Sequence, residues 1–507
     1  MVIIREGEKV KFPSYNKLLR LATAEQLKLY DSAAYRILSE MGVFIDDKEA
    51  IEYFKDTPVE IDEKELIFRF PEYWVREMIA KAPSSFVLAG RNSKNDLPIT
   101  GPKRDYYILP AAGATKQYKW NEVLNQWDSS ITDFNDVYES TKMMDAIDAY
   151  EGLSNSIVED VKSSHAGLPA ELHAAYAKWK GTSKFIGPIA ITEGGTDEWD
   201  YLAKMAAEVQ GGYDEFRKRP TIACLPTCIG PLQSTRQNFW AIVGGAKHHI
   251  PTFPYWGGTA PFTAPATPAS QIALSLACTH YGIAVSQYLS PGTASLPWVI
   301  CTAVDPNSGQ LAVAPMFLLT HGIGNQVYQD LYGLATFGCA HALNGSLEEV
   351  ATAWLANLLT LTLMGINVHQ FGGPPNAFMW EALPMGESIV NYVKQFLFNM
   401  NNALFPDDED VFSLKTILEV GPKGRFATHP HTLKYIDPKE GLYWYSKDWI
   451  HEHSDQWLAK GGKRWAYDTC RERLKELAKH EPEPLEKDVE ERLQSILKEA
   501  DEKLALF

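Results

Sequence analysis

The sequence predicts an α/β fold: a closed (β/α)8 TIM barrel with an N-terminal helical subdomain and a C-terminal helical extension. Short runs rich in β-branched and aromatic residues alternate with longer helical patterns between about residues 106 and 404, as in a parallel sheet covered by helices. The span of these runs suits a barrel of roughly 250 residues. The alternative is an open doubly wound sheet, but no Gly-x-Gly-x-x-Gly follows the first run, as a dinucleotide-binding fold would require.

The first predicted region, residues 1–100, is mainly helical. Apolar side chains recur there at helical spacing, for example from Leu27 to Ala34, and a second amphipathic stretch follows. Between these patterns, residues 43–45 and 66–70 predict short strands or extended connectors.

The second region, residues 101–405, contains the predicted barrel, and residues 406–507 form a charged helical region that packs on it. Residues 116–127 predict a β-hairpin inserted after the first strand, at the end of the barrel where active sites form. The eight barrel strands are predicted at residues 106–110, 152–158, 184–191, 221–226, 252–256, 298–303, 335–339 and 366–371.

Charge excludes two classes of partner. The 507 residues carry a net charge of −16, from 64 acidic and 48 basic side chains, which argues against binding nucleic acid or a membrane surface. The same charge is compatible with a cationic substrate, although many cytoplasmic enzymes are acidic for solubility alone.

Cysteine usage and targeting signals predict a cytoplasmic protein. The 6 cysteines lie mostly in apolar runs, as reduced core thiols do. The N-terminus is charged where a signal peptide would need an apolar stretch. The longest apolar region, residues 354–368, is interrupted by polar side chains such as Asn357 and Asn367, so it does not predict a membrane span.

Reacting groups in such a barrel lie at the C-terminal ends of the strands, and here those ends are rich in aromatic residues and glycines. Trp and Tyr faces attract alkylammonium cations, each desolvated contact contributing about 1 to 2 kcal/mol. The candidates for an aromatic cage around a quaternary amine are Tyr107, Tyr255, Trp256, Phe371 and Trp380. The alternative for each ring is that it only closes the core.

Three polar side chains are further candidates. His341 and His369 end neighbouring strands and are the predicted catalytic residues, because they could bind a substrate carboxylate or carry a proton. Arg236, after the fourth strand, is the candidate for binding a carboxylate such as that of a betaine. The alternatives are that the histidines are satisfied core residues and that Arg236 forms a helix-surface or interdomain ion pair.

No metal site is predicted. Thiolate and imidazole are the ligands that Zn²⁺ selects, but the spacing of the available residues is unlike that of known zinc sites, and the chain contains no CxxC. The residues considered as ligands are Cys224, Cys228, Cys339, His341 and His369.

Six sequence blocks occur together in one known family. They are residues 32–47 (Ser-Ala-Ala-Tyr-Arg-Ile-Leu-Ser-Glu-Met-Gly-Val-Phe-Ile-Asp-Asp), 70–75 (Phe-Pro-Glu-Tyr-Trp-Val), 82–91 (Ala-Pro-Ser-Ser-Phe-Val-Leu-Ala-Gly-Arg), 257–263 (Gly-Gly-Thr-Ala-Pro-Phe-Thr), 421–433 (Gly-Pro-Lys-Gly-Arg-Phe-Ala-Thr-His-Pro-His-Thr-Leu) and 480–489 (His-Glu-Pro-Glu-Pro-Leu-Glu-Lys-Asp-Val). In these blocks the chain resembles the trimethylamine methyltransferase superfamily, and the agreement extends over nearly the whole sequence.

The resemblance implies a barrel subunit that binds a small methylated amine and presents its methyl group to the cobalamin of a separate corrinoid protein. Trimethylamine-specific members use pyrrolysine, whereas related members without it demethylate glycine betaine and similar quaternary amines. This sequence contains only standard residues and resembles the second kind. It departs from the family at residues 301–305 and at residues 341–349. The second of these stretches lacks the Gly-rich, Asp-containing loop that the family would have there. A homo-oligomer is expected.

Two alternative functions remain open. A zinc-assisted methyltransferase for a thiol or methoxy substrate would use Cys339 and His341. A non-catalytic barrel that binds an amine or docks the corrinoid protein would agree with the departures after the seventh strand.

Overall fold

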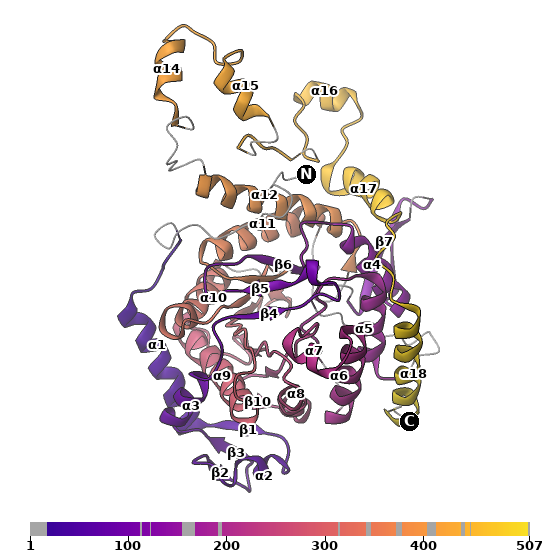
Figure 1. The fold of residues 1–507 in the computed structure, drawn as a ribbon. Helices are drawn as coiled ribbons and strands as arrows, with labels where there is room; N and C mark the ends of the chain where they lie inside the picture. The colour runs from indigo at the N-terminus through magenta and orange to yellow at the C-terminus, as the bar shows by residue number, and fades with distance from the viewer. Residues whose placement is uncertain are drawn as a thin grey trace.

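Short parallel β-segments and longer helices alternate through the middle of the chain, so the fold is mixed α/β (Figure 1). The structure is a computed structural model. It describes residues 18–111, 114–121, 123–154, 168–190, 195–312, 315–340, 346–371, 378–402, 412–437, 442–446 and 448–504.

Parallel pairings connect these segments in a continuous series. Strand β6 (Tyr107–Pro110) pairs with β16 (Val368–Phe371), which pairs with β15 (Phe337–Ala340). The Phe337 amide donates to the Pro297 carbonyl at 3.0 Å, which joins β15 to the preceding segment. The other segments are joined by parallel bridges: Ala111 with Ser154, Gly152 with Phe185, Ile189 with Cys224, Cys224 with Thr252, Thr252 with Ser295, and Tyr255 with Trp298.

Two small sheets extend the ends of these segments. One pairs β9 with β11, and the other holds β12, β13 and β14. Their bounds are β9 Thr227–Cys228, β11 Tyr255–Trp256, β12 Thr259–Ala260, β13 Thr302–Val304 and β14 Leu311–Ala312.

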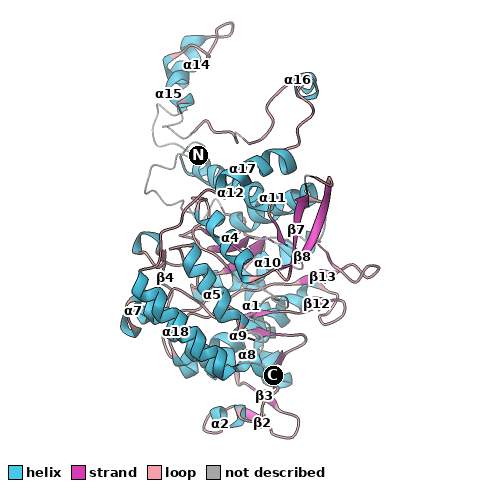
Figure 2. Ribbon diagram, turned by 90° about the vertical axis from the view of Figure 1, so that its right-hand side faces the viewer, coloured by secondary structure: helices cyan, strands magenta, loops and turns pink. Residues whose placement is uncertain are grey.

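Helices cover the outside of the parallel segments. Several begin at side chains that satisfy free amides of the first turn, such as the capping boxes of Asp133 with Asp136 and of Ser346 with Glu349. Figure 2 shows α4 and α5 on one side of the molecule. These helices are α4 (Phe134–Asp145), α5 (Ala170–Gly181), α6 (Thr196–Gln210), α7 (Tyr213–Lys218), α8 (Arg236–Lys247), α9 (Pro268–Leu289), α10 (Pro315–Val327), η4 (Tyr328–Tyr332), α11 (Leu347–Leu363) and α12 (Ala382–Asn402).

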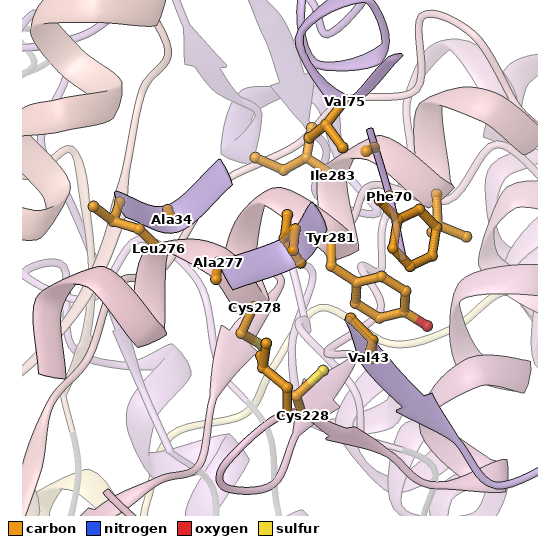
Figure 3. Packing of buried hydrophobic residues seen from close by; sticks show 14 of the residues in the cluster. Ala34, Val43, Phe70, Val75, Cys228, Leu276, Ala277, Cys278, Tyr281 and Ile283 are labelled. Atoms are coloured by element: carbon orange, nitrogen blue, oxygen red, sulfur yellow. The ribbon is translucent and has the colours of Figure 1, made fainter. Parts of the chain in front are cut away.

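Helix α9 is buried around its whole circumference from Gln271 to Gln287, so it is stable only when it is enclosed. The N-terminal elements provide part of that enclosure. Figure 3 shows Tyr281 and Ile283 of α9 beside Phe70 and Val75, which come from the first hundred residues. The N-terminal elements are α1 (Ala24–Arg36), η2 (Ile37–Met41), β1 (Val43–Ile45), α2 (Ala50–Phe54), β2 (Glu60–Asp62), β3 (Ile67–Arg69), α3 (Glu72–Ile79), β4 (Phe86–Leu88), η3 (Ser93–Asn95) and β5 (Leu97–Ile99).

The short strands predicted before residue 71 are confirmed as β1 and β3, which pair with each other in antiparallel register. Strand β1 also pairs in parallel with β10 (Gln233–Ser234). The N-terminal elements are therefore joined to the α/β region by a shared sheet as well as by a shared core.

A second group of buried side chains, here named the central cluster, lies among the parallel segments. Alternate residues of a strand belong to it, because successive side chains point to opposite faces. In β6, for example, Tyr107 and Leu109 belong to it while Ile108 packs on the other side. Its members are Leu88, Leu97, Ile99, Tyr107, Leu109, Phe185, Ala223, Leu225, Phe253, Leu296, Trp298, Ile300, Phe317, Ala335, Phe337, Cys339 and Val368.

The hairpin predicted after the first strand is confirmed. Strands β7 (Lys116–Asn121) and β8 (Gln126–Ile131) pair in antiparallel register, with Trp120 opposite Trp127. Strand β17 (Phe378–Met379) adds to β7 in parallel.

The C-terminal region is helical, with α14 (Leu414–Val420), α15 (Pro430–Ile436), α16 (Ser454–Ala459), η6 (Trp465–Thr469), α17 (Cys470–Leu477) and α18 (Lys487–Leu504). Trp449 stacks on Tyr392 of α12 with ring centroids 5.2 Å apart, and Trp465 lies 5.8 Å from Trp449. Part of this region therefore packs on the α/β region through tryptophans. Within the described ranges, no helix has the length and apolarity that crossing a bilayer would take.

Candidate functional site

An aromatic pair lies toward the C-terminal ends of two neighbouring parallel segments, where Trp298 belongs to the central cluster and Tyr255 packs against it. Tyr255 and Trp298 are bridge partners, and their rings stack with centroids 4.7 Å apart and planes inclined by 27°. Phe337 and Trp298 meet edge to face, with ring centroids 5.1 Å apart and planes inclined by 79°. Since side chains of adjacent parallel strands on one face lie side by side, the three rings form a continuous aromatic surface.

Polar side chains border this surface. Burial raises the pKa of Tyr255, and a hydrogen bond with Thr227 only partly opposes that rise, so the phenol stays neutral at ordinary pH. Cys339 belongs to the central cluster, and Gln370 is its register partner on the neighbouring strand. The Gln370 amide therefore lies on the same face as the aromatic surface.

The predicted cage residues do not share one site. Only Tyr107 and Tyr255 lie in or against the central cluster, and they occupy different positions along the segments. Tyr107 is the first residue of β6, and its hydroxyl donates to the carbonyl of Pro98 in β5 at 3.0 Å. Its ring thus closes the N-terminal end of the segments.

Trp256, Phe371 and Trp380 lie outside the central cluster. Trp256 is fully buried on the opposite face of its strand, in the core around α9. Phe371 packs on Trp354 of α11 at 4.4 Å. The Trp380 indole donates to Gln117 at 2.8 Å, and its ring is already covered by an ammonium group of this chain.

The predicted polar residues are also separated. His369 faces outward from β16, where its Nε2 contacts the Ile366 carbonyl at 3.0 Å and its ring lies 5.2 Å from Tyr106. Burial lowers the pKa of His369 to about 3, so its imidazole is neutral at ordinary pH and is not a ready proton donor. The other predicted catalytic residue, His341, lies outside the described residues.

Arg236 is engaged in an ion pair. It is the first residue of α8, its side chain is 65% exposed, and its Nε lies 3.2 Å from Asp47 of the N-terminal region. The geometry matches the alternative of an interdomain ion pair, and substrate binding by Arg236 stays a prediction.

The thiols and the imidazole considered as metal ligands are dispersed. Cys224 packs beside α6 and α8, Cys228 lies in the core around α9, and Cys339 belongs to the central cluster. In the part of the chain that the structure describes, no three His, Cys, Asp or Glu side chains come together as a metal site.

Trp298 and Gln370 were missed from the sequence as candidate site residues. The sequence pattern places Trp298 at the beginning of a predicted strand, and it gives the adjacent His369 and Gln370 no feature that separates their faces. The available signal was strand alternation: Tyr255 and Trp256, like His369 and Gln370, are neighbours that must face opposite ways.

Comparison with known proteins gives one family. Residues 8–317 match the family model described as trimethylamine methyltransferase (MTTB). The chain is 26% identical over 493 residues to the trimethylamine methyltransferase MttB of Desulfitobacterium hafniense, covering 94% of this chain and 93% of that protein. It is 25% identical over 485 residues to the MttB of Methanosarcina thermophila, covering 93% and 95% respectively. The solved monomethylamine methyltransferase MtmB of Methanosarcina barkeri is 11% identical, with a TM-score of 0.48 over 92% of this chain and 90% of that chain.

Proposed function

This chain belongs to the trimethylamine methyltransferase family, and on that premise we propose that it transfers a methyl group from a small quaternary amine of the glycine betaine type to a corrinoid protein. The observation that carries the proposal is the stacked pair of Tyr255 and Trp298 beside the ends of the parallel segments. The quaternary class is favoured because trimethylamine-specific members of the family use pyrrolysine, whereas this sequence contains only standard residues.

We also propose that the parallel segments close into a (β/α)8 barrel with the central cluster inside it. The support is the series of pairings, which starts at β6, passes through the successive segments to β15 and β16, and returns to β6. Active sites of such barrels lie at the C-terminal ends of the strands, and Tyr255 lies beyond the Thr252 bridge, toward the C-terminal end of its segment.

The aromatic surface would hold the substrate by its positive charge. A tetraalkylammonium group cannot donate hydrogen bonds, so the negative faces of aromatic rings are its natural contacts. When the C–N bond breaks, nitrogen keeps the electron pair and departs as a neutral amine, so this chain needs no acid at that nitrogen. A corrinoid held by the partner protein would supply the nucleophile that takes the methyl group, and the residues of this chain would orient the methyl group and exclude water.

Gln370 is the proposed contact for a substrate carboxylate. Its amide lies on the face of the aromatic surface, whereas Arg236 is held by Asp47. An amide can donate two hydrogen bonds to a carboxylate without placing a second cation beside the ammonium group. His341 remains a candidate for the same role.

The test is methylation of cob(I)alamin by the purified chain with a panel of methylated amines, followed by the absorbance of methylcobalamin. We expect turnover with at least one quaternary amine, and a drop in kcat/KM of about tenfold for Tyr255→Leu or Trp298→Leu, because each removes one cation–π contact. Tyr255→Phe keeps the ring and should retain most activity.

Trp256→Phe is the matched control, since it changes the adjacent ring on the other face of the strand. Its kcat/KM should stay within about twofold of the wild type. An equal loss in Trp256→Phe and Tyr255→Leu, or no turnover with any amine, contradicts the proposal. Gln370→Leu should raise KM for glycine betaine but not for tetramethylammonium, which lacks a carboxylate.

A further inference from the structure

Ser154 places a hydroxyl group on the inner face of the second parallel segment. Successive residues of a parallel strand bond alternately to its two neighbours, and their side chains alternate between the two faces in step. The Tyr255 amide donates to the Pro226 carbonyl of the preceding segment at 3.2 Å, and its ring packs on the central cluster. The Ser154 amide likewise donates to the Pro110 carbonyl of the preceding segment at 2.8 Å, whereas Leu153 packs on the outer side. The Ser154 hydroxyl therefore shares the face of the aromatic surface.

This hydroxyl group is buried without a hydrogen-bond partner. Ser154 is 0% exposed, and its Oγ contacts no donor or acceptor within the residues that the structure describes. A buried polar group without a partner keeps the cost of its desolvation, so nearly all such groups in folded proteins find one. A hydroxyl group can donate a hydrogen bond, and a ligand oxygen beside the central cluster would accept it.

The buried ammonium group of Lys178 approaches the same residue from helix α5. It donates to the Ser154 carbonyl at 2.9 Å, and no carboxylate among the described residues pairs with it. Two other described lysines are buried, and both are better satisfied. Lys184 donates to three carbonyl groups at 3.0 to 3.3 Å, and Lys394 pairs with Glu151. An ammonium group has three donors, so Lys178 differs from them in having a single acceptor and no counter-ion.

Ser154 and Gln370 lie on either side of one small side chain. Ser154 is the bridge partner of Ala111 at the end of the first segment. The Ala111 amide donates at 2.8 Å to the carbonyl of Phe371, the residue after Gln370. The eighth, first and second segments therefore place an amide, a methyl group and a hydroxyl group side by side on the inner face.

In the closed barrel proposed above, the second segment lies opposite the sixth, which carries Trp298. We propose, on the premise of the proposed function, that Ser154 and Lys178 hold the carboxylate of the substrate while the aromatic surface holds its ammonium group. Ser154 donates a hydrogen bond to the carboxylate. Lys178 is a positioning residue that supplies positive charge from behind the Ser154 backbone, away from the substrate nitrogen. The substrate class is therefore a short zwitterion, a quaternary ammonium carboxylate, and not a simple tetraalkylammonium ion.

Isothermal titration calorimetry of the purified full-length chain tests the inference without turnover. The probes are glycine betaine and tetramethylammonium, which share the quaternary nitrogen and differ in the carboxylate. We expect Ser154→Ala and Lys178→Met each to raise the dissociation constant of glycine betaine about tenfold, because a contact to a charged group is lost. The dissociation constant of tetramethylammonium should stay within about twofold. In turnover, KM for glycine betaine should rise by a similar factor while kcat is kept.

Matched controls carry the same substitutions elsewhere. Ser286→Ala removes a hydroxyl group that is also buried and unpartnered, but in α9, and Lys184→Met removes a buried lysine with three carbonyl partners. Both should leave the two dissociation constants unchanged.

The outcomes separate this inference from the proposed function. If the wild type binds and demethylates quaternary amines but Ser154→Ala and Lys178→Met bind glycine betaine normally, only the inference is overturned. Equal losses for the two probes also overturn it, because the whole pocket is then affected. A wild type that binds neither probe overturns the inference and the proposed function together.

Discussion

Asp31 is the centre of a buried network that joins the N-terminal helices to α9 and η4. Its carboxylate accepts from the Tyr332 hydroxyl at 2.5 Å, contacts His280 Nε2 at 3.0 Å and pairs with Arg76 at 3.2 Å. The other ring nitrogen of His280 contacts the Tyr328 hydroxyl at 2.6 Å. A buried carboxylate is stable only with such a set of partners.

Asp31→Asn should lower the free energy of unfolding by about 2 to 4 kcal/mol, because the charge-assisted bonds are lost in a buried site. Burial by itself would raise the pKa of Asp31. The hydrogen bonds from His280 and Tyr332 and the charge of Arg76 outweigh this effect, so the pKa of Asp31 lies below its usual value. The stabilisation of the folded state by the Asp31 carboxylate is therefore present above about pH 3.9, and it is lost as the pH falls through the lowered folded-state pKa.

Urea denaturation of the wild type and of Asp31→Asn at several pH values measures the difference between their free energies of unfolding. The control is Glu77→Gln, which removes an exposed pair with Lys81 at 3.4 Å and should cost less than about 1 kcal/mol. Equal costs for the two variants would contradict the importance given to the buried network.

Lys178 makes the stability depend on pH through the burial of its ammonium group, whereas Asp31 does so through its partners. Its ammonium nitrogen is buried and donates to the Ser154 carbonyl at 2.9 Å, and burial lowers the pKa of Lys178 to about 7. Between pH 7 and the ordinary lysine pKa near 10.4, the unfolded chain binds more protons than the folded one at this site, so stability rises with pH.

The unfolding free energy of the wild type should therefore gain up to about 1.4 kcal/mol per pH unit between pH 7 and 9 relative to Lys178→Met, in which this titration is absent. Denaturation at matched pH values checks the slope. Lys204→Met is the control, since Lys204 forms an exposed pair with Glu499. Parallel pH profiles for the wild type and Lys178→Met would show that this lysine titrates normally.

At the scale of elements, close approach between a helix and a strand depends on glycine. A Cβ at Gly324 of α10 would collide with the side chain of Val299 in the neighbouring parallel segment. Gly324 therefore allows α10 to lie closer to the β-segments than any other residue would.

Gly324→Ala should destabilise the protein by about 1 to 3 kcal/mol through overpacking, although alanine favours an isolated helix. Thermal unfolding followed by circular dichroism measures the change. Gly195→Ala is the control for an added methyl group, because a Cβ there meets nothing within 4 Å, and at this N-cap of α6 it should cost less than about 1 kcal/mol. A stabilised Gly324→Ala protein would mean that α10 moves away without cost.

Strand elements also explain which site residues could be predicted. Tyr255 and Trp256 are adjacent, and both belong to an apolar run that is covered on its two faces. In such strands the sequence gives no alternation of polar and apolar residues, so it does not reveal which face is central. The same ambiguity applies to His369 and Gln370.

At the scale of the whole molecule, the C-terminal helix α18 packs back on α5 and α6. Leu493, Ile496 and Leu497 are buried there with Leu202 of α6. The Arg492 guanidinium donates to Glu208 of α6 at 2.6 Å. The last helix is thus part of the same core as helices about 300 residues earlier in the chain.

Leu493→Ala should therefore lower the unfolding free energy by about 2 to 5 kcal/mol and increase proteolysis of the C-terminal helix. Ser495→Ala, an exposed position on the same helix, should change it by less than about 0.5 kcal/mol. If the two variants unfold alike in guanidinium chloride, α18 does not belong to the cooperative core.

The sequence by itself determined the mixed α/β class, the inserted hairpin and the family, because these depend on local periodicity and on ordered motifs along the chain. The tertiary structure decided which neighbouring side chains face the central cluster and which charges find partners. Asp47 and Arg236 meet through folding alone, and so do Tyr255 and Trp298. Such contacts depend on strand register and helix packing, which no local pattern in a doubly covered strand specifies.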